Sequence, residues 1–217
     1  MIDPNLNLDQ AIEKMEHCLI VRQMLHPSHQ DNLLLEEYMN IDDDTLRDDI
    51  AFFKQLKLGW VKIDNLYTSQ AQIDQAYDQA YFEPTGNGDY RDIQGYAQVE
   101  CPQFVTDQFA IKLWKSVGFL RCLPNKTIPK HKDMGRVAAL LIPCKGDQQT
   151  IPLTFWNDQN EKISEVIVDG PTLINTTIQH SVDETSEEER TNFNLCFDFP
   201  LTFESVADIL VRRGGIK

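Results

Sequence analysis

Short runs of β-favouring residues follow one another at close spacing from about residue 94 onward, and this pattern constrains the fold more than any other feature. The runs are Gly95–Val99, Val117–Leu123, Val137–Pro143, Ile151–Trp156, Ile163–Val168, Thr172–Asn175 and Asn192–Phe199. Turn-forming segments such as Asp169-Gly170-Pro171 separate them. Seven or eight strands at this spacing predict a β-sandwich or a jelly-roll barrel.

Residues 1–93 carry a helical periodicity instead. Apolar residues recur at three- and four-residue steps from Leu8 to Leu19, from Leu46 to Phe53 and from Ile73 to Tyr81. Ser69 and Gln72 form a capping-box pattern ahead of the third segment. We therefore expect an α+β protein with one structural domain. In it, residues 1–93 form a helical layer packed on the core, residues 94–200 form the β core, and residues 201–217 form a C-terminal helix.

The net charge of −14 narrows the possible partners. Nucleic acids and anionic membranes both favour a cationic surface, so neither is an expected partner. The longest apolar run, Val137–Pro143, is far shorter than the roughly 20 residues of a membrane-spanning helix. The N-terminus has no basic segment followed by an apolar stretch, and the five cysteines show no paired spacing. These features predict a cytoplasmic protein with reduced thiols.

The charge is distributed unevenly along the chain. Residues 1–100 hold 19 acids and 7 bases, whereas residues 101–217 hold 15 acids and 13 bases. Within the second part, the segment from Lys112 to Arg136 contains seven bases and one acid, Asp133. Such a local excess indicates either a solvated face or an anion-binding site.

Two of the five histidines lie in a pattern that is typical of a metal site. His131 and Asp133 alternate along an extended segment, so both side chains are expected on one face. His180 follows 47 residues after Asp133 and would supply a third ligand. Two imidazoles and one carboxylate form the facial triad of non-haem Fe(II) oxygenases, which leaves coordination positions open. By contrast, His26 and His29 are explained by a turn after the first helix.

Arg190 lies ten residues after His180 and begins the last β run. On the neighbouring strand of a jelly roll it would point into the barrel beside the metal. There its planar guanidinium would bind the distal carboxylate of a dicarboxylate through two hydrogen bonds. The alternative is a surface ion pair with the preceding glutamates, Glu187–Glu189.

From Phe119 to Phe199 the sequence resembles the 2-oxoglutarate/Fe(II)-dependent oxygenases, in particular their aspartyl/asparaginyl β-hydroxylase-like branch. The segments that carry the resemblance are 123–133, 136–143, 169–175 and 180–182, together with Arg190. The resemblance implies a double-stranded β-helix of the cupin type. It also implies Fe(II) bound by His131, Asp133 and His180, 2-oxoglutarate bound by Arg190, and O2 as the second cosubstrate.

Further contacts to the cosubstrate are implied less directly. The branch has a second arginine on the strand after the first metal ligands, and Arg136 is the nearest match. Where the branch has a serine, this chain has Leu120, so Arg121 or Asn175 is expected to complete the site. Members that modify epidermal-growth-factor-like domains have glycine at the place of Asp133. This chain keeps the carboxylate, so its substrate need not be the same.

These features predict a dioxygenase that hydroxylates an unactivated C–H bond and converts 2-oxoglutarate to succinate. An amino acid, a peptide or protein side chain, or a small metabolite is the expected substrate. One alternative is a cupin-like metal enzyme that does not use 2-oxoglutarate. The other is a catalytically silent binding module whose acidic N-terminal part binds a basic protein.

Overall fold

The computed structural model describes residues 8–24, 41–84, 93–109, 112–146, 150–213 and 215–216, so His26 and His29 lie outside the described residues. As far as the structure describes it, the chain divides into two compact units, Met1–Lys57 and Leu58–Lys217. The division between these units falls after Lys57, whereas the sequence analysis ended the helical region at residue 93 within a single domain, and that domain organisation stays a prediction. The division lies after Lys57 because β1 (Trp60–Lys62) pairs with β9 (Thr172–Asn175), which joins the intervening segment to the β core. How residues 1–57 pack on that core stays a prediction.

The first unit contains α1 (Leu8–Met24) and α2 (Asp43–Leu56). Apolar residues on both helices are buried, among them Met15, Leu46 and Phe53. The Asp42 side chain caps α2 by accepting a hydrogen bond from the Thr45 backbone N–H at 2.9 Å. The two predicted helical stripes therefore form one helix pair.

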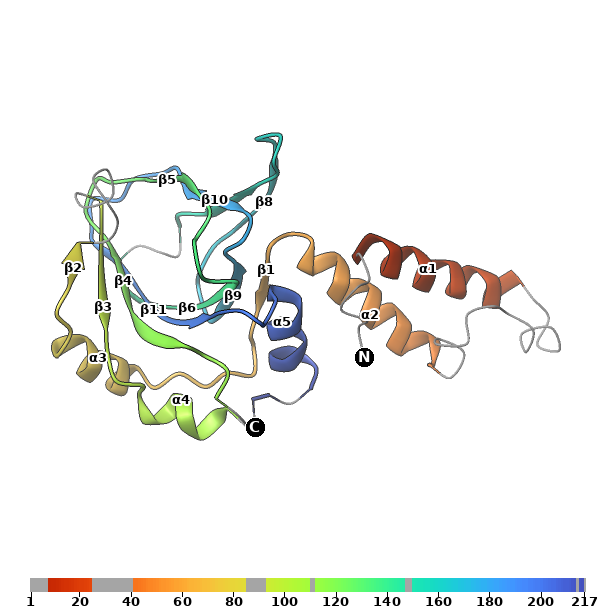
Figure 1. The fold of residues 1–217 in the computed structure, drawn as a ribbon, viewed down its shortest axis with the longest axis horizontal. Helices are drawn as coiled ribbons and strands as arrows, with labels where there is room; N and C mark the ends of the chain where they lie inside the picture. Colours follow the sequence, from red (N-terminus) through yellow and green to blue (C-terminus); the bar gives the residue numbers. More distant parts are fainter. Residues whose placement is uncertain are drawn as a thin grey trace. The chain divides into compact units, whose positions relative to one another are not determined.

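The second unit is built around two antiparallel sheets (Figure 1). Among the described residues, the larger sheet has seven strands in the order β1-β9-β6-β11-β4-β3-β2, and the smaller has four in the order β5-β10-β7-β8. The remaining bounds are β2 (Glu83–Pro84), β3 (Gln94–Gln98), β4 (Ser116–Cys122), β5 (Ile128–His131), β6 (Ala138–Lys145), β7 (Leu153–Trp156), β8 (Lys162–Val166), β10 (Gln179–Val182) and β11 (Arg190–Phe197).

The chain crosses repeatedly between these sheets from β4 to β11. Strands β4, β6, β9 and β11 join the larger sheet, whereas β5, β7, β8 and β10 form the smaller one. This alternation winds an eight-stranded jelly roll, which confirms the predicted α+β cupin-type core. Strands β5 and β10 were not among the predicted β runs, because proline, lysine, glutamine and histidine residues interrupt their apolar pattern.

Three short helices accompany the β core: α3 (Gln70–Asp78), α4 (Gln103–Gln108) and α5 (Phe203–Val211). The predicted capping box before α3 is wrong. Ser69 makes no side-chain cap bond, and Gln72 instead accepts a hydrogen bond from the Phe104 backbone at 3.0 Å. The capping box of α5 is formed by Thr202 with Ser205, and this helix lies within the predicted C-terminal segment 201–217. No described helix is long and apolar enough to cross a membrane.

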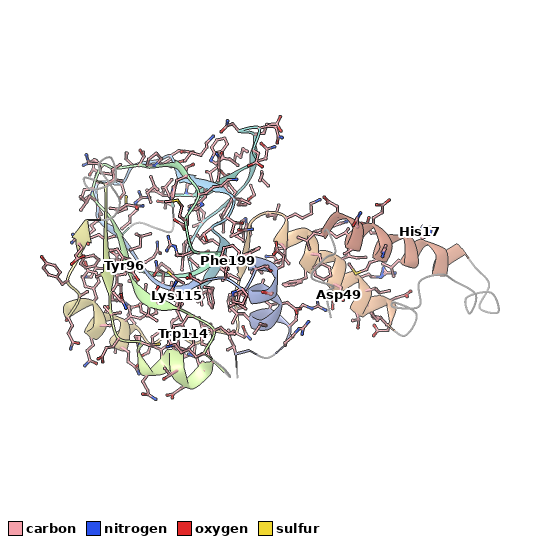
Figure 2. The ribbon with its side chains drawn as sticks, viewed as in Figure 1. His17, Asp49, Tyr96, Trp114, Lys115 and Phe199 are labelled. Atoms are coloured by element: carbon pink, nitrogen blue, oxygen red, sulfur yellow. The ribbon has the colours of Figure 1, made fainter. Side chains whose placement is uncertain are left out.

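Side chains alternate along each strand of the larger sheet, so its two faces pack against different parts of the protein. On one face Phe119 and Phe193 are fully buried, and they lie in edge contact with ring centroids 5.4 Å apart. Phe104 of α4 packs on Phe193 at 6.1 Å, and Tyr77 of α3 packs on Phe119 at 5.2 Å. Trp114, shown in Figure 2, lies just before β4 and is itself buried. The opposite face is turned toward the smaller sheet.

Candidate metal centre and its cavity

The three predicted ligands come together where the smaller sheet meets the loop after β5. His131 ends β5 and pairs directly with His180 of β10, and the two ring centroids are 4.3 Å apart. Asp133 follows two residues later, and its backbone N–H donates to Thr176 O at 3.0 Å. One ligand atom from each of the three side chains lies within 4.8 Å of the others. Strand pairing thus brings together two histidines that are 49 positions apart in the sequence.

Both imidazoles are oriented by the same local hydrogen bond. Nδ1 of His131 lies 2.8 Å from Pro129 O, and Nδ1 of His180 lies 3.0 Å from Ile178 O. A carbonyl oxygen can only accept, so Nδ1 is the donor in each ring and Nε2 is the nitrogen left for a ligand. Nε2 of His131 lies 3.7 Å from Asp133 Oδ1. Fixing the imidazole tautomer in this way is a common feature of metal sites.

Burial, together with a smaller contribution from the neighbouring His131, lowers the pKa of His180 to about 4. Removing a cationic imidazole from water is unfavourable, so His180 is neutral near pH 7. A neutral imidazole is the form that binds a metal ion. Both the position and the neutral state of His180 are therefore suited to binding a metal ion.

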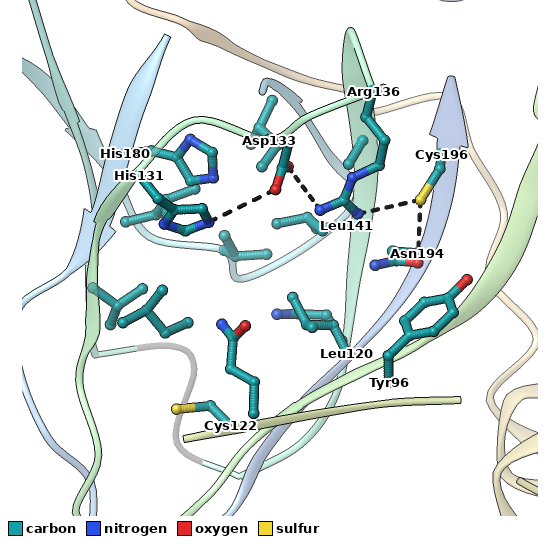
Figure 3. A pocket seen from close by; sticks show the side chains of 18 of the residues that line it. Tyr96, Leu120, Cys122, His131, Asp133, Arg136, Leu141, His180, Asn194 and Cys196 are labelled. Atoms are coloured by element: carbon teal, nitrogen blue, oxygen red, sulfur yellow. Dashed lines mark hydrogen bonds and ion pairs between the residues drawn. The ribbon is translucent and has the colours of Figure 1, made fainter. Parts of the chain in front are cut away.

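Arg136 lies against the carboxylate of the triad. Its Nη2 is 2.7 Å from Asp133 Oδ2, and its Nη1 donates to Cys196 Sγ at 3.3 Å. Figure 3 shows this arginine beside the triad on the wall of a cavity. This ion pair holds Asp133 Oδ2, whereas Asp133 Oδ1 is directed toward the histidines. The cosubstrate contact that the resemblance implies for Arg136 stays a prediction.

Arg190 is buried at the beginning of β11, with a relative exposure of 7%. Its Nη2 donates to Lys126 O at 3.2 Å and contacts Cys122 Sγ at 3.3 Å, while its Nε has no hydrogen-bond partner in the described part of the chain. The nearby Glu189 is 3.7 Å from Arg121 instead. The structure thus places Arg190 in the same cavity as the triad and not in a surface ion pair with that glutamate.

Arg121 and Asn175 are not among the residues that line the cavity, so their predicted contribution to cosubstrate binding has no support in this structure and stays a prediction. Leu120 and Cys122 face the cavity, and alternation along β4 turns Arg121 to the other face, over the Phe82 ring at 4.2 Å. Alternation along β9 likewise turns Asn175 away from the cavity, because the preceding residue, Ile174, lines it. Its side-chain oxygen accepts hydrogen bonds from the Thr177 backbone N–H at 2.9 Å and the Thr177 hydroxyl at 2.7 Å.

The cavity between the two sheets has a volume of about 560 Å³. Its apolar lining includes Leu141, Leu153 and Ile174. Among the described lining residues, the bases are Lys132, Arg136 and Arg190, and Asp133 is the acid. Two bases of the segment 112–136, Lys132 and Arg136, therefore line the cavity. The volume is in the range of small-molecule sites.

Several polar lining residues were missed by the sequence analysis. They are Gln94, Tyr96, Gln98, Ser116, Asn192 and Asn194. A usable pattern was present, because β11 places every second residue after Arg190 on the same face. That spacing selects Asn192, Asn194 and Cys196, all of which line the cavity.

No family model matches this chain, and no curated protein matches it. Similar solved structures include an oxidoreductase of the 2OG-Fe(II) oxygenase family from Burkholderia pseudomallei. The two sequences are 11% identical, the match covers 68% of this chain and 87% of that chain, and the TM-score is 0.48. A Pseudomonas putida prolyl-4-hydroxylase has 12% identity, coverages of 64% and 92%, and a TM-score of 0.47. An RmlC-like cupin from Ralstonia eutropha has 7% identity, coverages of 56% and 65%, and a TM-score of 0.34. These sequence identities and TM-scores are too low to support a functional assignment, which therefore rests on the geometry of the site.

Proposed function

We propose that this protein is an Fe(II)- and 2-oxoglutarate-dependent dioxygenase that hydroxylates an unactivated C–H bond. One observation carries the proposal: the ligand atoms of His131, Asp133 and His180 lie within 4.8 Å of one another, in a cavity that also contains the buried Arg190. The balanced reaction consumes the C–H compound, O2 and 2-oxoglutarate, and it yields the alcohol, succinate and CO2.

The donor set fits Fe(II). Two neutral imidazole nitrogens and one carboxylate oxygen form the combination that non-haem iron oxygenases use. Fe(II) in such a site supplies the activation of O2 that the oxidative decarboxylation of 2-oxoglutarate requires. The Nδ1 hydrogen bonds to Pro129 and Ile178 hold the rings, and Arg136 holds the carboxylate. The chain thus contributes ligands that are already oriented.

Arg190 suits the role of cosubstrate anchor. Its charge is permanent, its side chain is buried, and its Nε has no partner within the described residues. A carboxylate bound there would satisfy that donor and neutralise the guanidinium. The ten-residue step from His180 to Arg190 supports the aspartyl/asparaginyl β-hydroxylase-like branch in particular.

The proposal is tested by adding Fe(II) and 2-oxoglutarate to the protein under anaerobic conditions. We expect a visible charge-transfer band from the chelated cosubstrate, and succinate release once O2 and a substrate are supplied. Fe(II) binding without a band would favour a cupin-like metal enzyme that does not use 2-oxoglutarate. Absence of both Fe(II) binding and the band would favour a binding module and contradict the proposal.

Replacing Arg190 with alanine is expected to weaken 2-oxoglutarate far more than Fe(II). Loss of a charge-assisted, buried anchor costs about 1.5–3 kcal/mol, so the dissociation constant of 2-oxoglutarate should rise by roughly 10- to 150-fold. The Fe(II) dissociation constant should change less than about threefold, because Arg190 does not contact the triad. Titrations of the charge-transfer band with each component measure both values.

The matched control is Arg47→Ala, which removes the same side chain from an exposed position of α2. It should leave both constants unchanged. An equal loss of Fe(II) and 2-oxoglutarate binding in Arg190→Ala would show that the arginine supports the fold and does not anchor the cosubstrate.

A further inference from the structure

A chain of polar contacts runs from the triad along one wall of the cavity. It passes from Asp133 to Arg136, from Arg136 to Cys196 Sγ, and from Cys196 Sγ to Asn194 Oδ1 at 3.8 Å (Figure 3). Asn194 lies four residues beyond Arg190 on the same face of β11. It therefore marks a second polar region of the cavity, separate from the proposed cosubstrate anchor.

Asn194 itself has an unused donor. The residue has a relative exposure of 0%, and its Nδ2 has no hydrogen-bond partner among the described residues. Figure 3 shows that nitrogen turned toward the cavity, while the amide oxygen is turned toward Cys196. Burying an N–H without a hydrogen-bond partner is unfavourable, because its interaction with water is lost and nothing replaces it. A hydrogen-bond acceptor on a bound molecule would recover that loss.

Tyr96 and Ser116 flank Asn194. The Tyr96 hydroxyl lies near Ser116, and both residues line the cavity. Tyr96 takes this position because residue 118 is glycine: a Cβ there would lie 2.8 Å from the Tyr96 ring and 2.3 Å from Ala97 O. Tyr96, Ser116 and Asn194 together are called the Asn194 subsite below.

The charge around the cavity favours an anion at this subsite. Asp133 and Arg136 neutralise each other, and Lys132 is paired with Asp158 at 2.9 Å. One carboxylate of 2-oxoglutarate would neutralise Arg190, and its other carboxylate would offset one of the two charges of Fe(II). One positive charge at the metal is then left over, so the loaded cavity retains about one positive charge for a further ligand.

We propose that the Asn194 subsite binds the carboxylate of a free, small monocarboxylic acid, which is the substrate of the dioxygenase. This inference rests on the proposed function and names the substrate class. The carboxylate accepts hydrogen bonds from Asn194 Nδ2, and the rest of the acid extends toward the triad along the apolar wall. Because Asn194 is fully buried, the carboxylate reaches it only on a molecule that enters the cavity.

The test uses the full chain loaded with Zn(II), which is diamagnetic, and saturated with 2-oxoglutarate so that Arg190 is occupied. Saturation-transfer NMR then measures binding of straight-chain acids from propionate to octanoate and of neutral α-amino acids. The matching primary amides have the same shape without the charge. We expect the best acid to bind at least about tenfold tighter than its amide.

Asn194→Asp changes one atom and places a second carboxylate in the subsite. It should raise the dissociation constant of the acid by about tenfold or more and change that of the amide by less than about threefold. Asn160→Asp makes the same charge change at an exposed position and should change neither. If Asn194→Asp does not fold, Tyr96→Phe serves instead, with an expected loss of about threefold or more for the acid.

Each outcome decides the inference separately from the proposed function. Acids that bind no better than amides, or an Asn194→Asp variant that behaves like Asn160→Asp, overturn it, even where Zn(II) and 2-oxoglutarate bind as proposed. Binding only of a terminally blocked Ala-Ala-Glu-Ala-Ala peptide, without the free acids, also overturns it. If 2-oxoglutarate does not bind, the proposed function fails, and the same acid and amide titrations in its absence still decide the subsite.

Discussion

Replacing His131 with alanine is expected to abolish the charge-transfer band that Fe(II) and 2-oxoglutarate should produce with the intact protein. The change removes one of three ligands that lie within 4.8 Å of one another. Loss even of a residue that only orients a ligand lowers metal affinity about 10- to 100-fold, so loss of a ligand should lower it by about 100-fold or more. Anaerobic titration with Fe(II), followed by the band, measures the effect.

The fold should survive this change. The His131 side chain is 22% exposed and lies at the end of β5, where no apolar cluster depends on it. His17→Ala is the matched control, because His17 is exposed on α1 and lies outside the β unit (Figure 2). An undiminished band in His131→Ala, with the control also intact, would show that the triad is not the metal site.

Replacing Phe119 with alanine is expected to lower the free energy of unfolding of the β unit by about 3–5 kcal/mol. Phe119 has a relative exposure of 0% and packs against Tyr77 at 5.2 Å and Phe193 at 5.4 Å. The deletion removes these contacts and leaves a cavity between the larger sheet and α3. Phe119→Leu, which keeps most of the volume, should lose less than about 2 kcal/mol.

Urea unfolding followed by tryptophan fluorescence measures this loss in the β unit. All three tryptophans, Trp60, Trp114 and Trp156, lie in residues 58–217 and report on that unit. Tyr81→Ala is the control, because its side chain is 80% exposed. A loss below about 1 kcal/mol for Phe119→Ala would contradict the close packing of this face of the larger sheet against α3.

Local spacing was enough to predict much of the site. His131 and Asp133 are two residues apart on an extended segment, so their shared direction follows from strand geometry. Arg190 begins a run of β-favouring residues, and its place in the cavity follows once that run is a strand of a jelly roll. The polar residues after it obey the same period, yet Asn194 was not selected, since an asparagine alone indicates no particular chemistry.

Local spacing failed where two neighbours compete for the same role. Arg121 and Cys122 are adjacent on β4, and the sequence pattern does not say which of them faces the cavity. The pairing of Cys122 with Arg190 and the packing of Phe119 on α3 decide it, and Arg121 is left on the outer face. The Ser69 capping box failed for a related reason, because Gln72 bonds to Phe104, 32 residues away.

The sequence by itself determined most of the segments that become strands, though not β5 and β10, as well as which residues share a face of a strand and which side chains are able to bind a metal. Those properties depend on alternation and on side-chain chemistry, both of which are local. Only the tertiary structure decided that His180 meets His131, that Arg136 holds Asp133, and that Asn194 keeps a free donor in the cavity. These contacts depend on which strands pair and which sheet faces pack together, and that is set by the burial of the whole core.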